Sequence, residues 1–105
     1  MSRDIYLVEF PFSNISSTKK RPALLVSNLK GENDIFIQIS TKEKLTKDYQ
    51  INLLKTDCEG EIKFDSYINC DMIFTLHKDL IIRKIGSISD KKSKEVENIL
   101  QSLFK

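Results

Sequence analysis

The chain has few of the side chains that most enzymes use for catalysis. Its 105 residues include one histidine, two cysteines and no tryptophan. A histidine-pair ribonuclease needs one imidazole as base and another as acid, so the lone His77 excludes that mechanism within one chain, and we interpret it as a turn residue. Cys58 and Cys70 lie twelve residues apart without a Cys-x-x-Cys motif, which indicates neither a zinc site nor a disulfide framework. We expect two reduced structural thiols and no metal or other cofactor.

Long apolar stretches and the common catalytic motifs are missing as well. No run of about 18 apolar residues occurs, and no apolar segment of signal-peptide length follows Met1. We therefore expect a cytoplasmic protein that makes no contact with a membrane. The sequence contains no glycine-rich phosphate loop, no His-Glu-x-x-His, no Gly-x-Ser-x-Gly and no paired carboxylates on one helix face, which disfavours metal catalysis.

The composition that remains is that of an ordinary soluble domain. Hydrophobic residues make up 40% of the chain and charged residues 30%, and the length predicts a single domain over residues 1–105. A chain this short buries a modest core, which favours oligomerisation. The net charge of +2 is too small to indicate nucleic-acid binding by itself, so the placement of the charges matters more than their sum.

Short apolar or alternating runs separated by polar stretches predict about six strands. These runs cover residues 4–10, 22–27, 34–39, 49–54, 66–76 and 79–85. Residues 12–21 are expected to form a long surface loop, and 55–65 a polar connection. A C-terminal amphipathic helix follows, with Ser89 as its N-cap. Its apolar stripe consists of Val96, Ile99, Leu100, Leu103 and Phe104. This order predicts a mainly β fold, a small and strongly bent antiparallel barrel with a helix packed on it.

Cations and hydroxyls gather at the ends of two predicted strands. Residues 19–21 (Lys-Lys-Arg) come directly before one buried strand, and residues 40–42 (Ser-Thr-Lys) follow the next. If these strands pair antiparallel, Arg21 and Ser40 become neighbours. A guanidinium can hold two phosphate oxygens while a hydroxyl donates a third hydrogen bond. Spacing alone leaves open the simpler interpretation of a surface arginine and a strand-capping serine.

Five segments of the chain resemble one known family, in the order in which that family has them. They are 4–12 (DIYLVEFPF), 20–27 (KRPALLVS), 37–41 (IQIST), 65–71 (DSYINCD) and 82–90 (IRKIGSISD). Together they resemble the MazF/PemK/Kid toxins of type II toxin-antitoxin systems. The resemblance implies an SH3-like barrel of the CcdB/MazF/PemK type and a homodimer. It also implies a sequence-specific endoribonuclease, an mRNA interferase, that cuts single-stranded RNA without a metal ion.

The resemblance further implies partners and site residues. The antitoxin is expected to be acidic and partly disordered and to cover the RNA groove, and operator DNA is expected to be contacted only through the antitoxin complex. Catalysis falls on Arg21 and Ser40, with Thr41 as the neighbouring candidate. The expected reaction is attack of a ribose 2′-OH on the adjacent phosphorus, giving a 2′,3′-cyclic phosphate and a 5′-hydroxyl. The candidates for binding the RNA backbone are Lys19, Lys20, Lys42 and Lys44.

Two departures from the family pattern and two other functions have to be weighed. Arg3 stands where many relatives have glycine, and Ser40 stands where many have threonine. A toxin of the same fold that binds DNA gyrase, as CcdB relatives do, is one alternative. A catalytically silent RNA-binding or antitoxin-sequestering homologue is the other. The presence of Arg21 with Ser40 and Thr41 favours the enzyme, because a gyrase-binding toxin has no need for that pairing.

Overall fold

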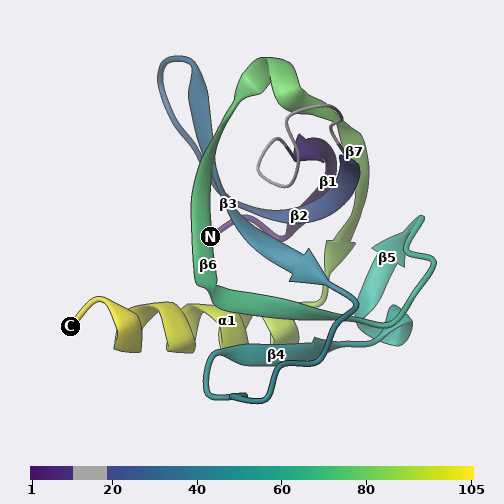
Figure 1. The fold of residues 1–105 in the computed structure, drawn as a ribbon, viewed down its shortest axis with the longest axis vertical. Coiled ribbons are helices and arrows are strands. Elements are labelled where there is room, and N and C mark those ends of the chain that lie inside the picture. Colours follow the sequence, from purple (N-terminus) through teal and green to yellow (C-terminus); the bar gives the residue numbers. More distant parts are fainter. Residues whose placement is uncertain (11–18) are drawn as a thin grey trace.

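The computed structural model describes residues 1–10 and 19–105, which form a bent antiparallel sheet and a C-terminal helix (Figure 1). The strands are β1 (Asp4–Phe10), β2 (Lys19–Asn28), β3 (Asn33–Ser40), β4 (Gln50–Leu53), β5 (Cys58–Gly60), β6 (Ser66–His77) and β7 (Ile81–Ile88). The helix is α1 (Asp90–Leu103), and short 3-10 turns cover Lys55–Asp57 and Lys78–Leu80. The order of strands across the sheet is β4-β6-β3-β2-β1-β7-β5. No pairing joins the outer strands β4 and β5 within the described ranges, so the sheet curls without closing.

The predicted mainly β fold with a C-terminal helix is confirmed, and three local expectations need correction. Residues 19–21 belong to β2 and not to a loop, and residues 12–18 of that predicted loop lie outside the described residues. Residues 55–65 contain a 3-10 turn and the short strand β5, where a polar connection was expected. Strand β7 begins at Ile81, because residues 78–80 form a turn capped by His77, whose Nδ1 accepts a hydrogen bond from the backbone of Asp79 at 3.1 Å.

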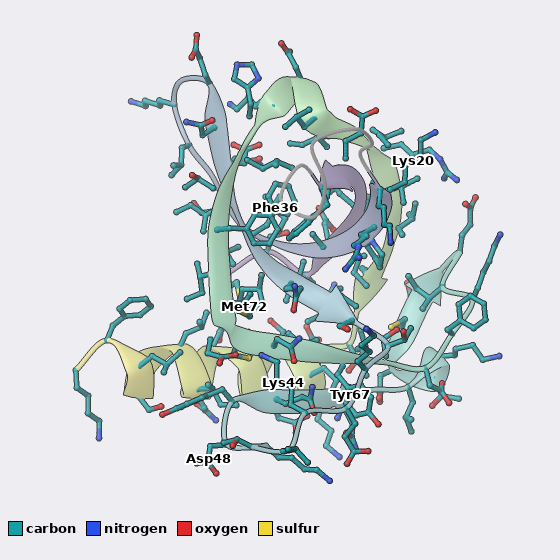
Figure 2. The ribbon with its side chains drawn as sticks, viewed as in Figure 1. Lys20, Phe36, Lys44, Asp48, Tyr67 and Met72 are labelled. Carbon is teal, nitrogen blue, oxygen red and sulfur yellow. The ribbon has the colours of Figure 1, made fainter. Side chains whose placement is uncertain are left out.

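A bulge in β6 reverses which of its alternating side chains face each core. Strands β3 and β6 pair in one register through Ile37 and Ile73, and the next pair is Gln38 with Asn69. Residues 70–72 of β6 therefore have no partner in β3. Because side chains alternate along a strand, an odd number of extra residues reverses which face each later side chain takes. Strand β6 turns sharply at this point, beside Met72 (Figures 1 and 2).

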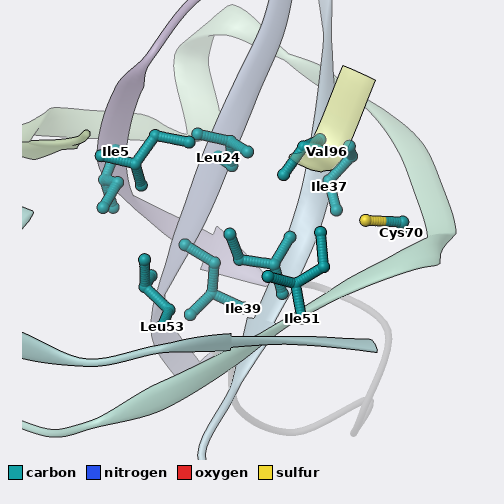
Figure 3. Close-up of a cluster of buried hydrophobic side chains, with 10 residues drawn as sticks. Ile5, Leu24, Ile37, Ile39, Ile51, Leu53, Cys70 and Val96 are labelled. Carbon is teal, nitrogen blue, oxygen red and sulfur yellow. The ribbon is translucent and has the colours of Figure 1, made fainter. Parts of the chain in front are cut away.

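The two cores lie on opposite faces of the sheet. The larger core is built from Ile5, Leu24, Ile37, Ile39, Ile51, Leu53, Ile68, Cys70, Ile88 and Val96 (Figure 3). The smaller core is built from Val8, Ala23, Leu25, Phe36 and Leu76. Helix α1 packs along β6 and β4 and inserts the fully buried Val96 into the larger core. The Ser89 hydroxyl accepts a hydrogen bond from the Lys92 backbone at 3.2 Å, which confirms Ser89 as the N-cap. The described part of the chain contains no helix with the length and apolar character needed to cross a membrane.

Strand β5 lies against β7 at a contact that only glycine permits. The φ angle of Gly60 is +105°, and an added Cβ would lie 2.4 Å from the Ile85 carbonyl oxygen and 2.6 Å from the Gly86 Cα. Gly31 has a similar φ of +111°, but an added Cβ there would meet no atom within 4 Å. The two glycines therefore separate the cost of a strained backbone angle from the cost of a steric clash.

We expect Gly60→Ala to lower the free energy of unfolding by about 1–3 kcal/mol more than Gly31→Ala, because only the former pushes β5 away from β7. Urea unfolding of both variants and the wild type measures the difference. Equal losses in the two variants would contradict the close packing of β5 on β7.

Candidate nucleic-acid interface

The strand register places two rows of side chains on one face of the four strands β2, β3, β6 and β4. In one row Ala23 lies opposite Gln38, Gln38 opposite Asn69, and Asn69 opposite Gln50. The next row along the strands contains Ser40, Tyr67 and Asn52, which face each other in the same way. Arg21 comes two residues before Ala23, and Ser40 comes two residues after Gln38. Continuing the β2–β3 register from Ala23 and Gln38 therefore brings Arg21 opposite Ser40.

Arg21 lies at the border between an aromatic cluster and this polar face. Its half-buried side chain holds the guanidinium carbon 5.7 Å from the centre of the Phe10 ring. The Phe10 ring packs edge-on against Phe74 with centroids 5.2 Å apart, and Phe74 stacks on Phe36 at 6.0 Å. A cation over an aromatic ring is attracted by the ring quadrupole. This contact restrains the arginine on the face that carries Ser40.

Ser40 is the last residue of β3 and begins the loop that follows it. Its Oγ accepts a hydrogen bond from the backbone N–H of Lys42 at 3.1 Å. Within the described part of the chain the hydroxyl of Ser40 donates to no acceptor, so its hydrogen is available to a ligand. A hydroxyl oriented through one accepted hydrogen bond is suited to donate another to a phosphate oxygen.

Thr41 and Lys20 lie at a cavity on the other face of the sheet. This cavity has a volume of about 390 Å³. Its lining includes Lys20, Pro22, Ile39, Thr41, Phe64 and Arg83. Ile39 and Leu24 belong to the larger core, which identifies the face, since alternate residues of β2 and β3 point the same way. The sheet thus brings Arg21 and Ser40 together and separates both from Thr41 and Lys20.

The other candidate lysines differ in how far acidic neighbours compensate their charge. Lys19 is exposed and lies two residues before Arg21 on β2, and so on the same face. The ammonium of Lys44 lies 3.5 Å from a carboxylate oxygen of Asp71. Across residues 1–10 and 19–105, no ion pair involves Lys19, Lys20, Arg21 or Lys42. These four cations are therefore free to meet an anionic partner.

A chain of side-chain amides crosses the polar face and holds the loop after β3. The Gln50 Nε2 donates to Asn69 Oδ1 at 2.8 Å, and Asn69 Nδ2 donates to Gln38 Oε1 at 2.7 Å. Gln50 also donates to the carbonyl oxygen of Lys42 at 3.2 Å and accepts from the backbone of Lys44 at 3.1 Å. Asn69 is only 2% exposed, so these bonds satisfy an amide that would be costly to bury alone.

Comparison with known proteins identifies the family. The model of the PemK-like, MazF-like toxins of type II toxin-antitoxin systems matches residues 1–104. The chain belongs to this toxin family. Among curated proteins no sequence matches it. The fold also agrees with that of solved structures, although sequence identities are low.

Three mycobacterial structures illustrate how far this likeness extends. An endoribonuclease in complex with its cognate antitoxin, from a mycobacterial species, superposes on the toxin with a TM-score of 0.73 at 17% identity, over 97% of this chain and 91% of that one. A second mycobacterial endoribonuclease superposes with a TM-score of 0.72 at 18% identity, over 97% of this chain and 88% of that one. The Mycobacterium tuberculosis toxin MazF-mt6 gives 0.72 at 16% identity, over 97% and 96%. At these identities the likeness establishes the shared fold.

Tyr67 of β6 lies opposite Ser40 of β3, and the sequence analysis did not identify it as a site residue. Its hydroxyl donates to Glu43 Oε2 at 3.2 Å, and Glu43 also pairs with Lys47. The hydrogen bond from Lys47, with that from Tyr67, lowers the pKa of Glu43. The hydrogen bond to Glu43 in turn raises the pKa of Tyr67. Tyr67 of the toxin therefore stays a protonated phenol at neutral pH.

The amides of Gln38, Gln50 and Asn69 were also missed from the sequence. One signal was present, since Gln38 and Asn69 each interrupt an apolar run that the structure buries. A polar residue in such a run needs a hydrogen-bond partner. The sequence could not name that partner, because the bulge in β6 decides which residues face each other. Among the described residues, no group of three or more His, Cys, Asp or Glu side chains is suited to hold a metal ion.

The two thiols of the toxin are free and strongly shifted towards the protonated form. Burial, followed by the charge of Asp57, raises the pKa of Cys58 to about 11. Burial, followed by the charge of Asp71, raises the pKa of Cys70 to about 12. Because the thiolate is the nucleophile, neither cysteine is activated at neutral pH.

We expect iodoacetamide to label the folded toxin at pH 8 about 100-fold more slowly than the urea-unfolded chain, since a pKa raised by about two units depletes the thiolate by that factor. The native rate should rise with pH up to about pH 11. Mass spectrometry of Cys58→Ser and Cys70→Ser assigns the rate to each site. Native labelling at pH 8 as fast as in urea would show that the thiols are not shielded.

Proposed function

We propose that this toxin is an endoribonuclease that cleaves single-stranded RNA, chiefly mRNA, at the face that carries Arg21 and Ser40. The observation that carries the proposal is the β2–β3 register at Ala23 and Gln38, which places Arg21 and Ser40 opposite each other when it is continued by two residues. Two similar structures are endoribonucleases of the same fold, which supports this activity. Uncompensated cations on the same strand, Lys19 and Arg21, supply the positive charge that an RNA backbone requires.

The proposed reaction is an internal transfer that needs no metal ion. The ribose 2′-oxygen forms a bond to the adjacent phosphorus while the bond from phosphorus to the 5′-oxygen breaks. The 2′-OH loses its proton and the departing 5′-oxygen gains one, so the products are a 2′,3′-cyclic phosphate and a 5′-hydroxyl. Arg21 stabilises the charge that develops on the phosphate oxygens.

Ser40 is the better candidate for the second catalytic group. It shares a face with Arg21, whereas Thr41 lines the cavity on the opposite face. The role of Ser40 is to donate a hydrogen bond to the scissile phosphate and to hold it for in-line attack. Lys19 and Lys42 are the lysines best placed to follow the RNA backbone. Lys44 is engaged with Asp71, and Lys20 lies at the cavity.

The remaining parts of the proposal concern assembly and setting. We propose that the toxin acts as a single domain in a cytoplasmic homodimer. Tyr49 and Met72 support a contact with a second copy, since they remain 40% and 42% exposed near the β6 bulge. We also propose an acidic antitoxin as partner, because the free cations on β2 and in the loop after β3 would attract it. Operator DNA would be bound only through that complex.

Arg21→Ala should reduce RNA cleavage by about 100-fold or more, because it removes the charge that stabilises the transition state. Purified toxin is incubated with a long single-stranded RNA in EDTA, and the cuts are mapped by primer extension. Arg3→Ala is the matched control, since Arg3 pairs with Asp90 at 3.4 Å and lies away from this face. No cleavage by the wild type, or full cleavage by Arg21→Ala, would overturn the assignment. The first result would favour the gyrase-binding or silent alternatives.

Ser40→Ala and Thr41→Ala should have unequal effects. We expect Ser40→Ala to lower kcat by about 100-fold while leaving the RNA Kd nearly unchanged, because the lost hydrogen bond strengthens in the transition state. Thr41→Ala should change kcat by less than about threefold, as a surface change away from the reacting atoms. Single-turnover kinetics and filter binding measure both. A larger loss in Thr41→Ala would show that the catalytic hydroxyl lies on the other face.

A further inference from the structure

The amide chain across the polar face has a direction. An amide end can donate through nitrogen or accept through oxygen, so each hydrogen bond fixes which way a neighbouring amide points. At Gln50 the orientation is fixed by the backbone, because one end accepts from the N–H of Lys44 and the other donates to the carbonyl of Lys42. Gln50 must then donate to Asn69, and Asn69 must donate to Gln38.

The row of hydrogen-bonded amides ends at Gln38, whose side-chain N–H group is not used by any of these bonds. Its Oε1 accepts from Asn69, which leaves Nε2 pointing away from that bond. Over the described ranges this nitrogen has no hydrogen-bond partner, and it is not among the fully buried polar atoms that lack one, so it is open to solvent. Its neighbour across β2 is Ala23, a buried residue of the smaller core whose side chain has no polar atom to accept from the amide. Two residues further along β3 lies Ser40.

The surroundings of this donor favour a base over a phosphate as its target. Arg21 and Ser40 occupy the adjacent row and are the groups suited to hold the phosphate. Gln38 is neutral and half-buried, and side-chain amides recognise nucleobases through the hydrogen-bonding edges of unstacked bases. A donor locked in orientation discriminates between bases, because a base that presents an N–H to it leaves two donors facing each other.

We propose that Gln38 is a specificity-determining residue whose Nε2 donates a hydrogen bond to a keto oxygen or ring nitrogen of a base next to the cleaved phosphate. Gln50 and Asn69 are positioning residues that keep this amide turned with its nitrogen outwards. This inference rests on the proposed function, since it assumes that RNA lies on the face of Arg21 and Ser40.

The direct test compares Gln38→Met with the wild type on a randomised single-stranded RNA library, with cut sites identified by sequencing. We expect the base preference at one position near the cut to fall about fivefold, the value of one neutral hydrogen bond, while preferences elsewhere persist. Gln101→Met, an exposed substitution on α1, is the matched control. Unchanged preference in Gln38→Met, or an equal loss at every position, would overturn the proposal.

Reversing the amide chain provides a test that a merely structural role would not satisfy. Asn69→Asp replaces the donor to Gln38 by an acceptor, so Gln38 must turn its nitrogen inwards and present oxygen to the RNA. Gln50→Glu, at a half-buried site, should reverse the row of amide hydrogen bonds from its other end. This variant is used if circular dichroism shows that Asn69→Asp does not fold. We expect the folded variant to shift preference at the same position as Gln38→Met, towards bases that present an N–H. Lower activity with unchanged preference would overturn the positioning role.

A binding selection separates this inference from the proposed activity. The same library is selected for affinity to wild type and to Gln38→Met, without any requirement for cleavage. If the wild type cuts nothing but the selected base preference changes in Gln38→Met, the endoribonuclease proposal fails and the role of Gln38 stands. If the wild type cuts and neither cleavage nor binding preference responds to Gln38→Met, the endoribonuclease proposal stands and the role of Gln38 fails.

Discussion

The three-residue bulge in β6 is the feature on which the rest of the structure depends. Before the bulge the even-numbered Ile68 points into the larger core, whereas after it the odd-numbered Ile73 packs there and the even-numbered Leu76 lies in the smaller core. Without the bulge, the register of Ile37 with Ile73 would continue to Gln38 with Met72, and an apolar side chain would interrupt the polar face. The same strand would then bury an amide in the larger core without a partner, which costs about 1–3 kcal/mol. One local irregularity thus provides both cores and the proposed RNA-binding face.

Hydrogen bonds from the polar face hold the loop after β3, which carries the candidate RNA-binding residues Lys42 and Lys44. Asn69 is buried and depends on Gln38 and Gln50 for its hydrogen bonds, and Gln50 in turn fixes the backbone at Lys42 and Lys44. The loop after β3 is therefore held by the body of the sheet, and the Ser40 hydroxyl is oriented by the same segment. A site built in this way would need little rearrangement for the proposed RNA binding, which would lower the entropic cost of reaching a reactive geometry.

The sequence pattern predicted most strands and the helix, whereas the composition of the candidate site depends on how the strands pair. The β-branched and aromatic residues of 4–10 and the alternation along 34–39 were sufficient to predict strands, and the apolar stripe of the last segment was sufficient to predict the helix. The proximity of Arg21 and Ser40 was predictable, because a short connection between neighbouring strands forces antiparallel pairing. The separation of Thr41 was not, since it depends on where β3 ends and which face its last residue takes. The amide chain was beyond prediction because residues 66–76 look like one continuous strand and contain no signal for the bulge.

The central claim, that RNA binds on the face of Arg21 and Gln38, can be tested by NMR with an RNA that the toxin is unable to cut. A single-stranded RNA with 2′-fluoro groups lacks the attacking hydroxyl and should remain intact in the complex. We expect its addition to shift the side-chain amide signals of Gln38 and Asn69 and the guanidinium signal of Arg21, with the backbone signal of Ser40. Shifts confined to the cavity on the opposite face, around Ile62 and Phe64, would contradict the claim.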